Sequence, residues 1–133
     1  MIKRSTFVLP LLIALAACAP ELHTSALQSV IVERLFFGRN VHGVPAVSDS
    51  AWGAFLAEEV TPRFPDGFTV WPAAGQWRGA DGRIERETSF VLELVHPSSA
   101  TADSNVAVII AAYKQRFQQE AVLRVIIPAH TSF

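Results

Sequence analysis

Hydrophobic and polar residues alternate along the chain in short runs, and four of these runs predict β-strands. They are rich in β-branched and aromatic residues and end near proline, glycine or aspartate. Asp81-Gly82 predicts a tight hairpin between the second and third runs, and Pro128 is expected to close the fourth. Because proline donates no backbone hydrogen bond, Pro72 predicts that the second strand lies at a sheet edge. The four predicted strands are residues 30–37, 68–78, 84–95 and 121–127.

Two other segments repeat apolar residues at helical spacing. The first follows a loop at residues 38–47, begins at the N-cap Ser48 and ends before Pro62. The second is expected to begin at Asp103 or Ser104. Their apolar faces consist of Trp52, Phe55, Leu56 and Val60 in the first helix and Val106, Ile109, Ile110, Tyr113 and Phe117 in the second. The resulting order, β-α-β-β-α-β, predicts an α+β ferredoxin-like sandwich with two helices on one face of a four-stranded antiparallel sheet.

Residues 1–17 have the pattern of a signal peptide. A basic start precedes the apolar run at residues 7–17, which is too short to span a bilayer as a helix. Leu15-Ala16-Ala17 then precedes Cys18, and this ending resembles the lipobox of bacterial lipoproteins. The resemblance implies that the leader is removed and that Cys18 carries fatty acyl chains such as palmitate. The alternative is an ordinary secretory signal in which Cys18 is incidental.

A lipid on Cys18 would anchor the mature protein to a membrane. Residues 18–28 show little periodicity and predict a short tether, whereas residues 29–133 predict a single domain. Ala19 stands where aspartate would retain an enterobacterial lipoprotein in the inner membrane, so the outer membrane is favoured if the host is Gram-negative. We therefore expect an exported protein whose partner, an envelope protein or a small ligand, lies near the membrane surface.

Composition narrows the class of protein. The chain of 133 residues is 50% hydrophobic, which suits one domain with a substantial core. Removal of a leader that holds Lys3 and Arg4 leaves nine basic against twelve acidic residues. This weak charge provides no basic face for nucleic acid. A single cysteine excludes an intramolecular disulfide and a cysteine-based zinc site.

The sequence contains no motif for a metal or a cofactor. His23, His42, His96 and His130 are widely separated and lack the spacing of metal ligands. Nucleophile-elbow, phosphate-loop and dinucleotide motifs are absent as well. We therefore expect neither a bound metal nor a cofactor.

One group of polar residues suggests a binding site. Arg63 and Asp66 lie in the turn before the second strand, Trp77 and Arg78 at its end, and Glu87 in the strand paired with it. In such a site the arginine forks would hold a small anionic or amide ligand. The alternative, which we favour, is that these residues form salt bridges and turn contacts, with Asp66 bonding its own backbone in an Asx turn.

The three tryptophans have two interpretations. Trp52 lies on the first helix's apolar face and is expected in the core. Trp71 and Trp77 are six residues apart in one strand and therefore point to the same face of the sheet. They either pack under a helix, which we favour, or line a cleft.

The sheet's second face is the other candidate for contact with a partner. The strands carry apolar residues at both parities, so the face without helices is also expected to be buried. A homodimer formed face to face would bury it. The charges expected at the seam of that dimer are Glu33, Arg34, Glu93 and Arg124.

Several short stretches together resemble the family catalogued as domain of unknown function 3574, which consists of small, mostly exported bacterial proteins. The most distinctive stretch is residues 61–70, Thr-Pro-Arg-Phe-Pro-Asp-Gly-Phe-Thr-Val. The others are Leu35-Phe36-Phe37-Gly38-Arg39, Val47-Ser48 with Trp52 and Phe55, Gly75-Gln76-Trp77-Arg78, Arg86-Glu87-Thr88-Ser89, and Tyr113-Lys114 with Arg116-Phe117 and Gln118-Gln119-Glu120. The resemblance implies an exported, often lipidated protein and no established activity.

Two functions follow from these features. The first is a membrane-anchored binding or structural module of the cell envelope, supported by the anchor, the tether and the lack of a catalytic motif. The second is a small cofactor-independent enzyme, an oxygenase or isomerase, with a pocket between sheet and helices. Only analogy of fold supports the second, so we favour the binding module. A deep pocket between sheet and helices would reverse that preference.

Overall fold

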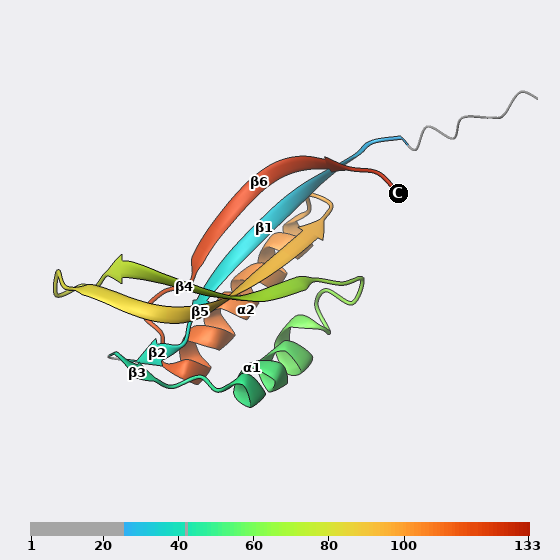
Figure 1. The fold of residues 1–133 in the computed structure, drawn as a ribbon. Coiled ribbons are helices and arrows are strands. Elements are labelled where there is room, and N and C mark those ends of the chain that lie inside the picture. Colours follow the sequence, from blue (N-terminus) through green and yellow to red (C-terminus); the bar gives the residue numbers. More distant parts are fainter. Residues whose placement is uncertain (1–25, 42) are drawn as a thin grey trace, which may run out of the picture.

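The computed structural model describes residues 26–41 and 43–133, so the predicted leader, Cys18 and most of the tether lie outside the described residues. A four-stranded antiparallel sheet has the order β4-β5-β1-β6, and Figure 1 shows α1 and α2 on the same side of it. The predicted α+β class, with four antiparallel strands and two helices, is confirmed. The elements are β1 (Gln28–Gly38), β2 (Asn40–Val41), β3 (Val44–Pro45), α1 (Asp49–Phe55), the π-helical turn η1 (Leu56–Val60), β4 (Thr69–Arg78), β5 (Ile84–His96), α2 (Ala100–Phe117) and β6 (Leu123–Thr131).

The two prolines of the four-stranded sheet, Pro72 and Pro128, lie in its edge strands. Pro72 belongs to β4, which is an edge strand as predicted. The prediction that Pro128 closes the last strand is wrong, because β6 continues to Thr131 and Pro128 is paired with Ile31 of β1. An edge strand needs hydrogen bonds on one side only, so proline fits where its missing N–H would face outward. The loop predicted at residues 38–47 also contains the small hairpin of β2 and β3.

Serine caps both helices. The Ser48 side chain accepts a hydrogen bond from the Ala51 N–H at 3.1 Å, as predicted for the first helix. The predicted cap at Asp103 or Ser104 is wrong: Ser99 caps α2 by accepting from the Ala102 N–H at 3.1 Å. The extra turn places only one buried residue, Ala102, against the core. A single small apolar residue adds little to the helical periodicity, so the predicted start was too late.

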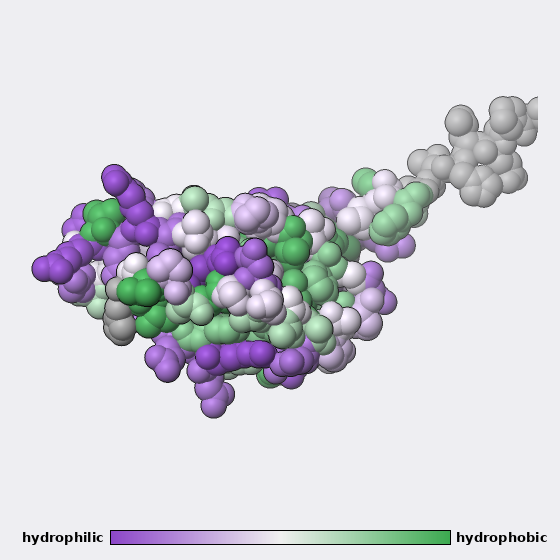
Figure 2. Space-filling model, turned by 60° about the horizontal axis from the view of Figure 1, so that its bottom comes forward, coloured by the Kyte–Doolittle hydropathy of each residue, from purple (hydrophilic) through white to green (hydrophobic). Residues whose placement is uncertain are grey.

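Aromatic rings fill the space between the sheet and the helices. Phe37 of β1 packs on Tyr113 of α2 with ring centroids 4.5 Å apart, and Trp52 of α1 stacks on Phe90 of β5 at 4.7 Å. Phe37, Phe55 and Tyr113 are fully buried. The predicted core position of Trp52 and of the second helix's stripe is confirmed. Figure 2 shows the helix side, where hydrophilic groups lie beside hydrophobic ones.

The sheet's other face, which we call the open face, carries no helix in Figure 1. Trp71 and Trp77 lie on it, since Trp71 is paired with Val91 and Trp77 with Glu85, at the parity opposite to the core residues of β5. The favoured prediction that these tryptophans pack under a helix is therefore wrong. Of the four charges predicted on this face, only Arg34 and Glu93 lie there, joined by a 2.7 Å ion pair.

Glu33 and Arg124 lie on the helix side instead, which corrects their predicted place at a dimer seam. Arg124 donates two hydrogen bonds to the Glu33 carboxylate, at 2.5 and 2.7 Å, and a third to Asp103 of α2 at 2.6 Å. Glu33 is almost fully buried. Because it shares the parity of Leu35 and Phe37 in β1, it points toward the helices and needs a partner there.

Candidate functional site

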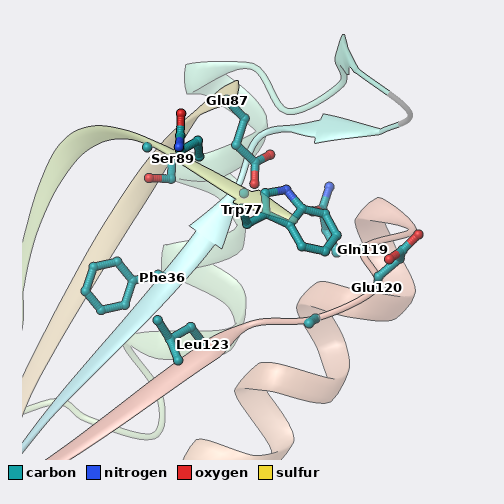
Figure 3. Close-up of a pocket in the computed structure, with 11 residues that line it drawn as sticks. Phe36, Trp77, Glu87, Ser89, Gln119, Glu120 and Leu123 are labelled. Carbon is teal, nitrogen blue, oxygen red and sulfur yellow. The ribbon is translucent and has the colours of Figure 1, made fainter. Parts of the chain in front are cut away.

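A pocket of about 250 Å³ opens on the open face, where β1 and β4 end and β5 and β6 begin. We call it the open-face pocket. Figure 3 shows side chains from these strands and from the loop after α2 converging on it. Its lining residues are Phe36, Gly38, Gly75, Gln76, Trp77, Glu87, Ser89, Gln119, Glu120, Ala121 and Leu123.

The apolar part of the pocket comes from three strands. Phe36 of β1 is paired with Leu123 of β6, and both side chains lie on the same side of the pocket in Figure 3. Trp77, near the end of β4, forms another wall and keeps 37% of its surface exposed. A large aromatic ring that is neither in the core nor fully exposed is available to a ligand.

Glu87 is the main charged group in the pocket. Its carboxylate lies against the backbone of Gly38, so close that a Cβ at Gly38 would lie 2.8 Å from both carboxylate oxygens. The Asn40 backbone N–H donates to it at 3.4 Å. Burial raises the pKa of Glu87 above its ordinary value, the Asn40 N–H opposes that shift, and the neighbouring Glu85 adds to it. The site therefore holds a carboxylate with little compensation for its charge.

The loop after α2 is held against the end of β1. Gln118 ends α2 in the left-handed conformation, with φ of 53°. The next residue, Gln119, donates from Nε2 to the Asn40 carbonyl at 3.0 Å. From below, Tyr113 donates its hydroxyl hydrogen to the Gly38 carbonyl at 2.8 Å. Burial raises the pKa of Tyr113 far above neutrality, so this hydroxyl remains protonated and continues to donate.

The structure brings together only part of the polar cluster predicted from sequence. Trp77 and Glu87 both line the open-face pocket. Arg78, the next residue of β4, is exposed and is not part of the lining. Arg63 and Asp66 precede β4, whereas Trp77 is near its end, and a strand of ten residues spans about 30 Å. A single site containing all five residues is therefore excluded.

Arg63 and Asp66 have different surroundings. Arg63 donates to the Glu59 carbonyl at 2.7 Å and to the Glu59 carboxylate at 3.0 Å, which fixes the turn after η1. Asp66 lines a separate hollow beside Phe68 and Pro97. Within residues 26–41 and 43–133, the Asp66 side chain makes no hydrogen bond to its own backbone, so the predicted Asx turn is not formed there. Such a turn occurs at Asp81 instead, which accepts from the Arg83 N–H at 2.9 Å.

The remaining lining residues were not predicted from the sequence. Phe36 belongs to a strand whose two parities are both apolar, so its orientation became known only from the register with β5 and β6. Gln119 and Glu120 lie in a polar stretch after a helix, where no spacing rule indicates a pocket. The one signal in the sequence that pointed to Gln119 and Glu120 was the family resemblance, which includes the stretch Gln118-Gln119-Glu120.

A second polar group surrounds Glu33 on the helix side. His96 Nε2 lies 3.3 Å from a Glu33 oxygen without hydrogen-bonding geometry, and His96 Nδ1 donates to the Pro97 carbonyl at 2.9 Å. Hydrogen bonds to Glu33 and Asp103 hold the pKa of Arg124 above its usual value. Both oxygens of Glu33 are occupied by Arg124, so this group serves the packing of α2 on the sheet.

The described residues contain no group of three or more metal-ligating side chains in a suitable arrangement. Within the same residues, no helix combines the length and apolarity needed to cross a membrane.

The chain resembles known proteins at the level of family and fold. The family model described as "Protein of unknown function (DUF3574)" matches residues 32–133, and no curated protein matches the chain. Its structure is similar to a phage SAM lyase in complex with S-methyl-5'-thioadenosine, with a TM-score of 0.63, 16% identity, and coverage of 78% of this chain and 90% of that chain. For the apo state of a phage SAM lyase, the TM-score is 0.57 and the identity 15%, with coverage of 77% of this chain and 89% of that chain. For a PII-like signalling protein from Thermus thermophilus, the TM-score is 0.44 and the identity 20%, with coverage of 80% of this chain and 92% of that chain. The two similarities to phage SAM lyase indicate a shared fold alone.

Proposed function

The chain belongs to the DUF3574 family, whose description assigns no activity, and we therefore propose a function from the geometry of this chain. We propose that it is a lipid-anchored envelope protein that binds a small ligand in the open-face pocket. The observation that carries this proposal is the contrast between the sheet's two faces. The helix side is filled by the aromatic core, whereas the open face carries a pocket lined by Trp77, Glu87 and Gln119. A concave site with an apolar wall and a few polar groups suits a small molecule.

The anchor is the second part of the proposal. The ending Leu15-Ala16-Ala17-Cys18 supports lipid on Cys18 and export to the envelope. Replacement of Cys18 by serine is expected to move the protein from the membrane fraction to the soluble fraction, because the protein loses the acyl chains that anchor it. A Cys18→Ser variant that still partitions with membranes would contradict the anchor without affecting the pocket.

The pocket is tested by filling it. A Cβ at Gly75 would meet no atom within 4 Å, and Gly75 lines the pocket. The side chain of Gly75→Leu therefore starts in open space and is expected to occupy the ligand's space. Gly53 on the exposed side of α1 has the same freedom, and Gly53→Leu is the matched control. The lipoprotein is isolated from envelopes and its copurified small molecules are identified by mass spectrometry. We expect a molecule present with wild type and Gly53→Leu and lost with Gly75→Leu. The same molecules in all three samples would overturn the proposal.

We assign the domain to the ferredoxin-like arrangement, which the strand order β4-β5-β1-β6 and the chain order of the main elements support. Such folds also host enzymes, but fold carries no activity by itself. The space between sheet and helices, where a small oxygenase or isomerase would need its pocket, is occupied by the core. We expect no consumption of SAM by this protein, and consumption that Gly75→Leu abolished would favour an enzyme.

The open face also supports a homodimer. Val95 and Ile127 lie on it outside the pocket lining, with 48% and 36% of their surfaces exposed. The ion pair of Arg34 and Glu93 on the same face is self-complementary about a two-fold axis. We expect a dimer after the lipid is removed, and a clean monomer in sedimentation at micromolar concentration would contradict it.

A further inference from the structure

The charge of the open-face pocket identifies the class of ligand that fits it. Its lining includes two carboxylates, Glu87 and Glu120, and no lysine, arginine or histidine. In the part of the chain that the structure describes, every ion pair involves other acids, so neither carboxylate has a basic partner. An anionic ligand, which was the less favoured interpretation of the polar cluster in the sequence, would be repelled here.

The apolar walls indicate that the positive charge belongs to an organic molecule. The lining is mainly apolar, and Phe36, Trp77 and Leu123 are its large hydrophobic side chains. A cation is attracted to the face of an aromatic ring, most strongly to tryptophan. A bare metal ion would need several oxygen or nitrogen ligands, and the described residues bring no three His, Cys, Asp or Glu side chains together in a suitable arrangement. A volume of about 250 Å³ is below the usual range for drug-sized ligands, so the molecule is small.

We propose that the ligand is a small organic cation, such as an alkylated ammonium compound, with its charge against Glu87 and its apolar groups against Trp77 and Phe36. This inference rests on the proposed function, because it takes the open-face pocket as the binding site. Gly38 allows the Glu87 carboxylate to take this position, since the absence of a side chain at Gly38 leaves room for the carboxylate beside the backbone. Ser89 and Gln119 offer hydrogen bonds to polar groups on the rest of the ligand.

Binding of a cation should depend on pH. Burial raises the pKa of Glu87, and only the ionised carboxylate attracts the cation. Affinity is therefore expected to fall as the pH decreases through that pKa. Of the acids near Glu87, Glu85 and Glu120 reinforce the negative potential. The charge of Arg39 acts on Tyr113 together with that of Glu87, but Arg39 is already paired with Asp49 at 2.7 Å.

The test compares two probes of the same shape and different charge. The full chain is purified in a maltoside detergent and titrated by calorimetry with choline and with 3,3-dimethylbutan-1-ol, its neutral carbon analogue. We expect choline to bind roughly tenfold more tightly, since its charge is attracted both to the ionised Glu87 carboxylate and to the Trp77 ring. Glu87→Gln should reduce that preference, because the attraction to the carboxylate is lost, and leave the affinity for the alcohol unchanged. Gln keeps an acceptor for the Asn40 N–H, so folding is preserved.

Glu58→Gln is the control, because it removes one negative charge from an exposed pair with Arg116 outside the pocket. It should leave both affinities unchanged. Equal binding of choline and the alcohol, or binding of choline that Glu87→Gln does not weaken, overturns the inference while leaving the pocket as a binding site. Failure of choline to bind at millimolar concentration also overturns it. Failure of the proposed function is detected separately, by copurified molecules that persist in Gly75→Leu.

Discussion

Two carboxylates on opposite faces of one sheet show how the same chemical group acquires different roles. Glu33, on the helix side, is almost fully buried, and both of its oxygens accept hydrogen bonds from Arg124. Glu87, on the open face, is half-buried and accepts only a long hydrogen bond from the Asn40 backbone. A buried charge is tolerated when it is paired. Glu33 therefore belongs to the scaffold, whereas Glu87 has capacity for an external partner.

The largest expected effect comes from removing the partner of Glu33. Arg124→Met leaves a buried carboxylate uncompensated, and we expect the free energy of unfolding to fall by about 3–5 kcal/mol. Adding Glu33→Leu should restore most of the loss, because an apolar pair replaces a buried charge. Denaturation in urea measures both values. A loss below about 1 kcal/mol for Arg124→Met would mean that Glu33 does not depend on this pair.

The bond between the core and the pocket should have a smaller effect. Tyr113→Phe deletes the hydroxyl that donates to the Gly38 carbonyl at 2.8 Å, beside the Glu87 carboxylate. We expect a loss of about 1–2 kcal/mol, because a buried carbonyl loses its donor. Urea denaturation measures the loss. Unchanged stability would show that another donor reaches the Gly38 carbonyl, and that Tyr113 does not support the floor of the pocket.

The exposed ion pair on the open face provides a contrast with the buried one. Arg34→Gln breaks the 2.7 Å contact with Glu93, where both side chains are partly in water. We expect a change of less than about 1 kcal/mol in the free energy of unfolding of the monomeric domain. A loss as large as that of Arg124→Met would contradict the view that burial separates these two pairs. If the dimer forms, the same variant should weaken it.

The smallest effect concerns pH. Because burial raises the pKa of Glu87, the folded state binds this proton more tightly than the unfolded state does. Its contribution to stability is therefore present at low pH and is lost as the pH rises through the raised pKa. Glu87→Gln lacks this dependence, so its stability relative to wild type should increase as the pH rises above about 4.5. A pH-independent difference between the two proteins would contradict the shift.

The sequence was sufficient for the elements but not for their contacts. Periodicity located the core stripe of α2, and Pro72 correctly predicted an edge strand. Periodicity did not locate the start of α2, whose N-cap is Ser99, since the first turn carries only one buried apolar residue. Trp77 and Glu87 were identified because a hairpin brings them together, whereas Arg63 was grouped with them without regard to the length of β4. Phe36 and Gln119 depend on strand register and on a loop after a helix, which a single sequence does not encode in a local pattern.

The most direct test of the central claim is a carbon-13 NMR titration of the Glu87 side-chain carboxyl, with and without choline. Without choline, we expect Glu87 to titrate above its ordinary pKa of about 4.5, since burial disfavours the charged carboxylate. Choline should lower that pKa, because a cation beside the carboxylate stabilises its ionised form. A Glu87 pKa that remains the same in the presence of choline would contradict the claim that this unpaired carboxylate receives a cationic ligand.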